Sequence, residues 1–135
     1  MAKLLLQDVK VTINGTNLSN AIKSVELSLS SDAKDVTAFG DGWINRISGL
    51  KDGSVKIDFF QDFGASAVEA TVFPLFGTLA SVVVLPTSGT PSVTNPSYTF
   101  LALVNAHMPV AGAVGDVATL SVTWPTSGTV TKATA

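Results

Sequence analysis

The chain has 135 residues, a formal net charge of −2 and only 13% charged residues, against about 25% in typical globular domains. This length predicts a single domain, residues 1–135, with its own hydrophobic core. The charge balance excludes the basic surface with which most nucleic-acid-binding proteins grip phosphate. The low charge also indicates that some apolar surface meets another protein chain rather than water.

The chain contains no cysteine, which excludes disulfides and thiolate metal sites. The N-terminal apolar run, Leu4 to Leu6, is too short for the core of a secretory signal. Later apolar runs at 81–85 and 100–104 are far shorter than the roughly 18 residues of a membrane helix. We therefore expect a soluble, cytoplasmic protein that does not bind membranes.

Period-two alternation predicts strands at residues 8–13, 21–30 and 53–62. The first runs into Asn14-Gly15, a dipeptide favoured in tight hairpins. In the second, Val25, Leu27 and Leu29 share one face. The third has an inward and an outward set: Val55, Ile57 and Phe59 inward, and Lys56, Asp58, Phe60 and Asp62 outward.

Residues 65–79 break the strand pattern and favour one short or kinked helix. Apolar residues recur there at helical spacing, at Val68, Val72, Leu75, Phe76 and Leu79. Ser66 is a candidate N-cap, Gly77 a candidate C-terminal stop, and Pro74 a poor fit inside the helix.

Further strands are predicted at 80–85, 98–105 and 117–124, and the second of these is apolar on both faces, as expected of a strand covered on both sides. Two copies of a short motif, "LPTSGT" at 85–90 and "WPTSGT" at 124–129, are predicted to be turns that end strands. The predicted fold class is mainly β: a small β-sandwich or barrel with one packed α-helix and a long loop between two long strands.

Catalytic signatures are missing from the sequence. The one histidine, His107, has no G-x-S-x-G elbow to accompany it, and neither a Walker loop nor an H-E-x-x-H motif occurs. We expect no enzyme activity and no cofactor. Calcium is an alternative for Asp32, Asp35 and Asp41, whose oxygens are ligands of the kind calcium takes, although their spacing matches no EF-hand.

The long loop, residues 31–52, is the most informative segment. Connections of this length inside a compact domain are either functional or disordered. This one is rich in large apolar side chains and also contains Arg46, and aromatic residues and arginine are enriched at protein interfaces. We therefore interpret it as a docking loop.

The stretch "KDVTAFGDGWINRISGLKDGSVKIDFFQDF" at 34–63, continuing into "SAVEATVFPLFGT" at 66–78, resembles the major tail tube proteins of long-tailed bacteriophages. The resemblance implies a β-sandwich subunit that forms hexameric rings, and these rings stack into the tail tube through which DNA passes without specific binding. It also implies assembly in the host cytoplasm, a place in the virion tail, and contacts with tape measure, tail tip and tail terminator proteins.

In that family the loop between the two long strands reaches a neighbouring subunit or ring. The resemblance places this role on seven positions here: Asp35, Val36, Phe39, Trp43, Ile44, Arg46 and Ile47. We further predict that Glu26, Asp58 and Asp62 line the lumen, because acidic groups repel phosphate. A capsid decoration protein or surface adhesion module is the alternative, since low charge and many turns suit it too.

Overall fold

The computed structural model describes residues 5–134, which fold into seven strands and three short helical segments. The strands are β1 (Lys10–Ile13), β2 (Thr16–Asn17), β3 (Ile22–Asp35), β4 (Arg46–Phe60), β5 (Leu79–Leu85), β6 (Ser97–Leu103) and β7 (Thr119–Ala133). The helical segments are η1 (Ser19–Ala21), α1 (Val68–Val72) and η2 (Phe73–Leu75).

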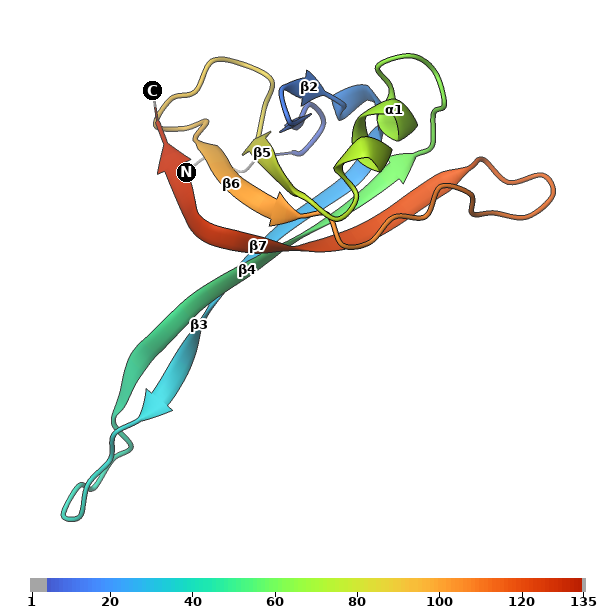
Figure 1. Cartoon of the computed structure of the whole chain (residues 1–135). Coiled ribbons are helices and arrows are strands. Elements are labelled where there is room, and N and C mark those ends of the chain that lie inside the picture. The colour runs from blue at the N-terminus through green and yellow to red at the C-terminus, as the bar shows by residue number, and fades with distance from the viewer. Residues whose placement is uncertain (1–4, 135) are drawn as a thin grey trace.

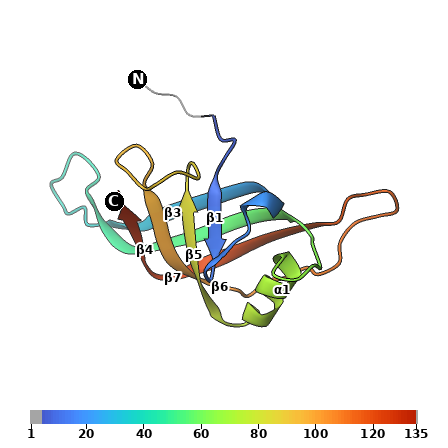
Figure 2. The same cartoon turned by 90° about the horizontal axis from the view of Figure 1, so that it is seen from above.

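All strand pairs are antiparallel, and the strand order is β2-β1-β5-β6-β7-β4-β3. Strand β7 joins two layers: its first part pairs with β4, through the Ser54↔Pro125 register, and its second part pairs with β6 from Thr126 onward. The sheet therefore folds back on itself around one core (Figures 1 and 2). The prediction of a small β-sandwich or barrel is confirmed.

The second copy of the repeated motif lies at the bend of β7. Residues 124–129 continue the strand, so the prediction of a turn that ends a strand is wrong here. Proline has no N–H to donate, and Pro125 stands where the pairing partner changes. The Thr126 hydroxyl donates to the Gly53 carbonyl (3.2 Å), which ties the bend to β4.

The core is built from the inward faces of both layers. Val55, Ile57 and Phe59 of β4 are fully buried, as their alternation predicts. Trp124 packs against Phe59 with ring centroids 6.4 Å apart, and its indole N–H donates to the Ala106 carbonyl (2.9 Å). No helix among residues 5–134 is long and apolar enough to cross a membrane.

A helix is present within residues 65–79, as predicted, but it is much shorter than the pattern indicates. Only Val68–Val72 is α-helical, and η2 follows with Pro74 in its first turn. Ser66 is no N-cap, since Ala67 holds that position and Ser66 has a φ of +58°. Gly77, with a φ of +85°, ends the helical segment as predicted.

Strand β6 is covered on one face only, which corrects the prediction of a strand covered on both sides. Phe100 and Ala102 are buried, whereas Leu101 is 43% exposed. The same outer face continues onto β5, where Leu79 is 48% exposed. The apolar character of this outer face comes from a surface that the subunit itself leaves open.

Replacing Trp124 with alanine is expected to lower the free energy of unfolding by about 3–5 kcal/mol, because a fully buried aromatic leaves a cavity. The matched control is Phe63→Ala, which removes an exposed aromatic and should change the value by less than about 0.5 kcal/mol. Urea unfolding followed by fluorescence and circular dichroism measures both. Equal losses would contradict the placement of Trp124 in the core.

Candidate assembly interface

The segment predicted to be a loop at 31–52 is mostly a β-hairpin. Strands β3 and β4 stay paired as far as Asp35↔Arg46, so the connecting loop is only residues 36–45. The hairpin projects far from the body (Figure 1). We call residues 30–52 the arm. Every arm residue is exposed except Gly49, which is half-buried.

A bulge interrupts the arm. The register passes from Ser31↔Lys51 to Ala33↔Ser48, which leaves one extra residue on β4. A Cβ at Gly49 would lie 3.0 Å from the Asp32 Cβ, so glycine fits the close approach of the two strands there. Such a bulge re-aims the outer half of the arm relative to the sheet.

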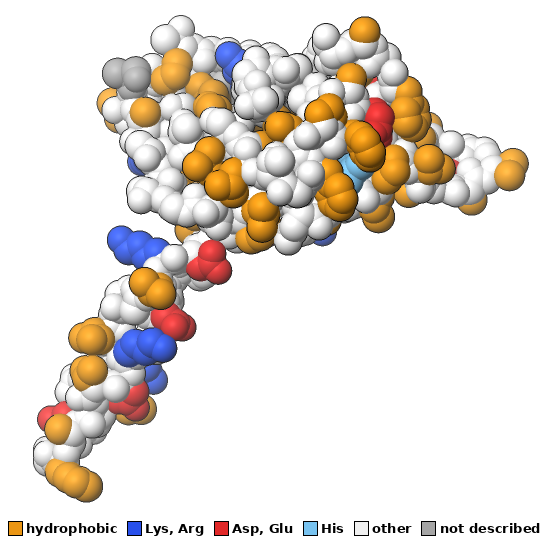
Figure 3. All heavy atoms as spheres, viewed as in Figure 1, with side chains coloured by type: hydrophobic (Ala, Val, Ile, Leu, Met, Phe, Trp, Pro, Cys, Tyr) orange, Lys and Arg blue, Asp and Glu red, His pale blue; other side chains and the backbone are white. Residues whose placement is uncertain are grey.

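Large apolar side chains along the arm are exposed to solvent (Figure 3). The exposed fractions are 109% for Phe39 and 87% for both Trp43 and Leu50. Val36, Ile44 and Ile47 are also exposed. The arm contains all seven residues predicted for docking, and they lie at or next to its tip: Asp35, Val36, Phe39, Trp43, Ile44, Arg46 and Ile47.

Hydrogen bonds within the chain shape the tip. The Val36 N–H donates to the Asn45 carbonyl (2.9 Å), and the Asn45 N–H donates to the Thr37 hydroxyl oxygen (2.8 Å). The Thr37 N–H donates to Asp35 Oδ1 (2.8 Å). Hydrogen bonds from the hydroxyl and the backbone N–H of Thr37 lower the pKa of Asp35 below its usual value of 3.8.

The other aspartates of the arm also have partners close by. Asp41 Oδ2 accepts from the Ala38 N–H (2.9 Å) and from the Asn45 side-chain amide (3.1 Å). Asp32 forms an exposed salt bridge with Lys34 (3.0 Å). Within residues 5–134 no group of three or more His, Cys, Asp or Glu is arranged to hold a metal ion. The carboxylates therefore hold the shape of the arm.

Two of the residues predicted to line the lumen share one polar sheet face. Glu26 is paired with Lys56, and Asp58 lies between Ser24 on β3 and Ser121 on β7. The Ser121 hydroxyl donates to Asp58 Oδ1 (2.5 Å). This face is the reverse of the one that covers the core.

Asp62, the third of these residues, lies elsewhere. Strand β4 ends at Phe60, and Asp62 follows in the connection to α1. Its Oδ1 accepts from the Gly64 N–H (2.9 Å), and its carbonyl accepts from the Glu69 N–H (3.1 Å). The strand alternation that predicted Asp62 on the outward face therefore stops before it.

His107 connects two segments of the fold through its contact with Glu69. Its Nε2 lies 2.9 Å from Glu69 Oε1, and its side chain is only 3% exposed. Its Nδ1 is buried and has no hydrogen-bond partner among the described residues. The contact ties the segment after β6 to helix α1.

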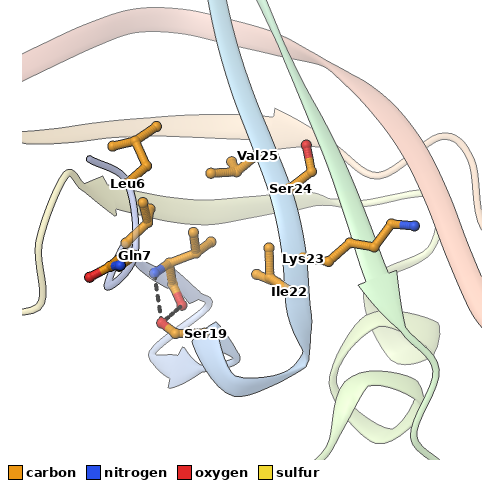
Figure 4. Close-up of a pocket in the computed structure, with 9 residues that line it drawn as sticks. Leu6, Gln7, Ser19, Ile22, Lys23, Ser24 and Val25 are labelled. Atoms are coloured by element: carbon orange, nitrogen blue, oxygen red, sulfur yellow. Dashed lines mark hydrogen bonds between the residues drawn. The ribbon is translucent and has the colours of Figure 1, made fainter. Parts of the chain in front are cut away.

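A shallow hollow of about 250 Å³ lies beside strand β3 (Figure 4). Ser19 is one of its lining residues, and its hydroxyl oxygen accepts from the Val11 N–H (2.9 Å). Lys23 points away from Ser19, and its Nζ lies 5.9 Å from the centre of the Phe60 ring. Serine and lysine are thus not arranged as a nucleophile and base.

Sequence reasoning missed one exposed apolar surface. Phe76 and Leu79 belong to the helical-spacing pattern at 65–79, yet they are 53% and 48% exposed. Phe73 is also 59% exposed. The signal that could have found this surface is Pro74, because a proline that ends regular α-helix geometry also ends the 3.6-residue pattern.

Neither a model of a known protein family nor a curated protein matches the chain. Solved structures do match. The SPP1 tail tube structure, determined by solid-state NMR and cryo-EM, has a TM-score of 0.78 at 13% identity and covers 98% of this chain and 80% of its own. The chain has the tail tube fold.

Two further solved structures match the chain over almost its whole length. A chain from the virion of a native gene transfer agent particle has a TM-score of 0.74 at 13% identity, with 93% of this chain and 95% of that chain covered. A chain of the anti-feeding prophage baseplate, a six-fold symmetrised structure, has a TM-score of 0.64 at 11% identity, with 98% and 97% covered. At these identities the likeness establishes the shared fold.

The Asp35 carboxyl is expected to titrate below its usual pKa of 3.8, and Thr37→Val should raise that pKa by removing the hydroxyl. Because the folded-state pKa is lowered, the stabilisation is present above the unfolded pKa and is lost as pH falls through the folded value. NMR titration of the side-chain carbons measures the pKa. Thr129→Val on β7 is the control, and an unchanged Asp35 pKa in Thr37→Val would contradict the assignment.

Proposed function

We propose that this chain is the tail tube subunit of a long-tailed phage or a phage-like particle. Its copies form hexameric rings, and the rings stack into the tube through which DNA is delivered. The tail tube fold supports this proposal. It is also supported by likeness to a chain in the tail of an empty gene transfer agent particle, computed with helical refinement and C6 symmetry. That chain has a TM-score of 0.64 at 16% identity, with 91% of this chain and 92% of that chain covered.

The observation that carries the proposal is the exposed apolar arm. A monomer that functions alone rarely leaves a phenylalanine and a tryptophan free at the end of a projecting hairpin. In water such surface favours association, and the aromatics that fill a partner's pocket dominate interface energy. The arm therefore supports the role of an assembly element.

The energetics favour the stacking of whole rings over the association of two single subunits through one arm. Burial of Phe39 and Trp43 contributes about 1.5–3 kcal/mol for each side chain. Association costs roughly 4–15 kcal/mol in lost translational and rotational freedom. One arm contact is therefore weak alone, whereas the arms of a whole ring make their contacts in a single association step. Stacking is expected to be cooperative for this reason.

The polar face of β3, β4 and β7 is the proposed lumen wall, with Glu26 and Asp58 as its acidic groups. Carboxylates repel DNA phosphate, and the serines and threonines around them hold no charge that would retain it. Lys56 lies opposite Glu26 and offsets part of that negative charge. Tape measure, tail tip and tail terminator proteins are the further partners that this role implies.

The direct test is negative-stain electron microscopy of the purified protein. Hollow tubes with six-fold end views are the expected result. Isolated trimers or monomers at high concentration would overturn the proposal and favour the decoration or adhesion alternative.

Phe39→Ser with Trp43→Ser is expected to leave a folded subunit that no longer polymerises, because both side chains are exposed and lie outside the core. Light scattering and electron microscopy measure polymer, and circular dichroism measures folding. The matched control, Phe63→Ser with Val93→Ser, removes exposed apolar side chains away from the arm and should keep its tubes. Normal tubes from the arm variant would show that the arm does not drive assembly.

Glu26→Lys with Asp58→Lys is expected to permit tube assembly but to reduce DNA delivery by particles that carry the variant, because lysines on the lumen wall retain phosphate. Delivery is measured as transfer per particle counted by microscopy. Asp62→Lys is the matched charge control, since Asp62 lies off this face, and should deliver DNA normally. Unchanged delivery by the double variant would place the face outside the lumen.

A further inference from the structure

A second apolar surface lies on the body, over η2, β5 and β6. We call Phe73, Phe76, Leu79 and Leu101 the body patch. The β5–β6 register brings its strand residues together, since Leu79 pairs with Leu103 and Ser81 pairs with Leu101. The Gly77 N–H donates to the Val104 carbonyl (2.7 Å), which holds the end of the helical segment beside β6. Figure 3 shows hydrophobic side chains gathered on this face around the histidine.

The body patch is preformed. The Phe73 ring lies 6.0 Å from the His107 ring, and His107 is held in turn by Glu69. The Thr78 N–H and hydroxyl both donate to the Leu75 carbonyl, at 2.9 and 2.6 Å. A surface held by such contacts loses little conformational entropy when a partner binds.

The arm does not cover the body patch of its own chain. It leaves the body at the end away from α1, and both views show this separation (Figures 1 and 2). Each subunit thus presents two separate exposed apolar surfaces, one projecting and one on the body. A contact between two unlike surfaces is head-to-tail, and it closes into a ring or continues into a filament according to the rotation between copies.

We infer that the tip of the arm of one copy docks on the body patch of a second copy. This inference rests on the proposed function and names the surface that receives the arm. The two surfaces match in chemistry: the tip exposes Phe39 and Trp43 almost completely, and the body patch exposes between 43% and 59% of each of its four apolar side chains.

Charge also matches across the proposed contact. Arg46, next to the aromatic tip, forms no salt bridge within the described part of the chain, which includes only the Lys34–Asp32 and His107–Glu69 pairs. Glu69 lies at the edge of the body patch, because its carbonyl accepts from the Phe73 N–H, and its side chain is 19% exposed. In the proposed contact, Arg46 beside the aromatic tip of one copy lies opposite Glu69 beside the body patch of the other.

Cysteine cross-linking tests the contact, because the chain has no cysteine of its own. Ile44→Cys and Leu79→Cys in one chain place one thiol on the arm and one on the body patch, and they keep Phe39, Trp43, Phe73 and Phe76. Oxidation of assembled protein should produce a ladder of dimers, trimers and longer multimers on a non-reducing gel. Ile44→Cys with Val93→Cys is the control and should remain monomeric on the gel.

The outcomes separate this inference from the proposed function. Tubes without a ladder would overturn the docking site and leave the tube role standing. A ladder that stops at dimers would also overturn it, since it indicates a symmetric contact of two like surfaces. Without tubes, the tube role fails, and the presence or absence of the ladder in concentrated solution still decides the docking.

A mixing experiment gives an independent test. The arm variant (Phe39→Ser with Trp43→Ser) and a patch variant (Phe73→Ser with Phe76→Ser) should each fail to polymerise alone. When the two variants are mixed at high concentration, so that a single weak arm contact is populated, the intact arm of one docks on the intact patch of the other and growth stops after one contact. Sedimentation of the concentrated mixture should show complexes of limited size that neither variant forms alone. Normal tubes from the patch variant alone, or no complex in the concentrated mixture, would overturn the inference.

Discussion

The continuous antiparallel pairing of β3 with β4 supports the rest of this structure. One strand, β4, serves two roles along its length: residues 54–59 are paired on both flanks and contribute to the core, while residues 46–52 pair only with β3 beyond the body. A free two-stranded hairpin is marginally stable in water. The arm holds its shape because the buried half of the same strands fixes their register, with Val55, Ile57 and Phe59 inside the core.

The two faces of this sheet have different chemistry because only one is needed for the core. Its inner face is buried against β1, β5 and β6, and its outer face has Ser24, Glu26, Asp58 and Ser121 without an apolar requirement. Since this face does not contribute to the core, its composition is free to meet the needs of the lumen wall that we propose. Strand β7 closes the arrangement by contributing to both layers.

The low charge of the chain follows from its two uncovered apolar surfaces, the arm and the body patch. The docking that we propose between them is a head-to-tail contact, which closes into a ring if the rotation permits and otherwise continues into a filament. The tip has a defined shape before it meets a partner, because Asp35 and Asp41 accept hydrogen bonds from the loop around them. An arm that is already ordered loses less entropy on docking, which favours the ring stacking that we propose.

The sequence by itself determined the elements whose burial alternates. Val55, Ile57 and Phe59 are inward as their spacing predicts, and Gly77 ends the helical segment. The apolar character of Phe39 and Trp43 also led to the prediction of an interface segment, and both side chains are exposed. These features are local, since a two-residue period or a glycine needs no knowledge of distant partners.

Only the tertiary structure decided what the local pattern leaves open. The arm strands are exposed on both faces, so burial imposes no alternation, and residues 31–35 and 46–52 could not be recognised as strands until their pairing was seen. Likewise Asp62 leaves the strand face because β4 ends at Phe60, and Leu101 and Phe76 stay uncovered because no second layer reaches them. Sequence patterns record which side chains are apolar, whereas long-range packing decides which of them the subunit itself buries.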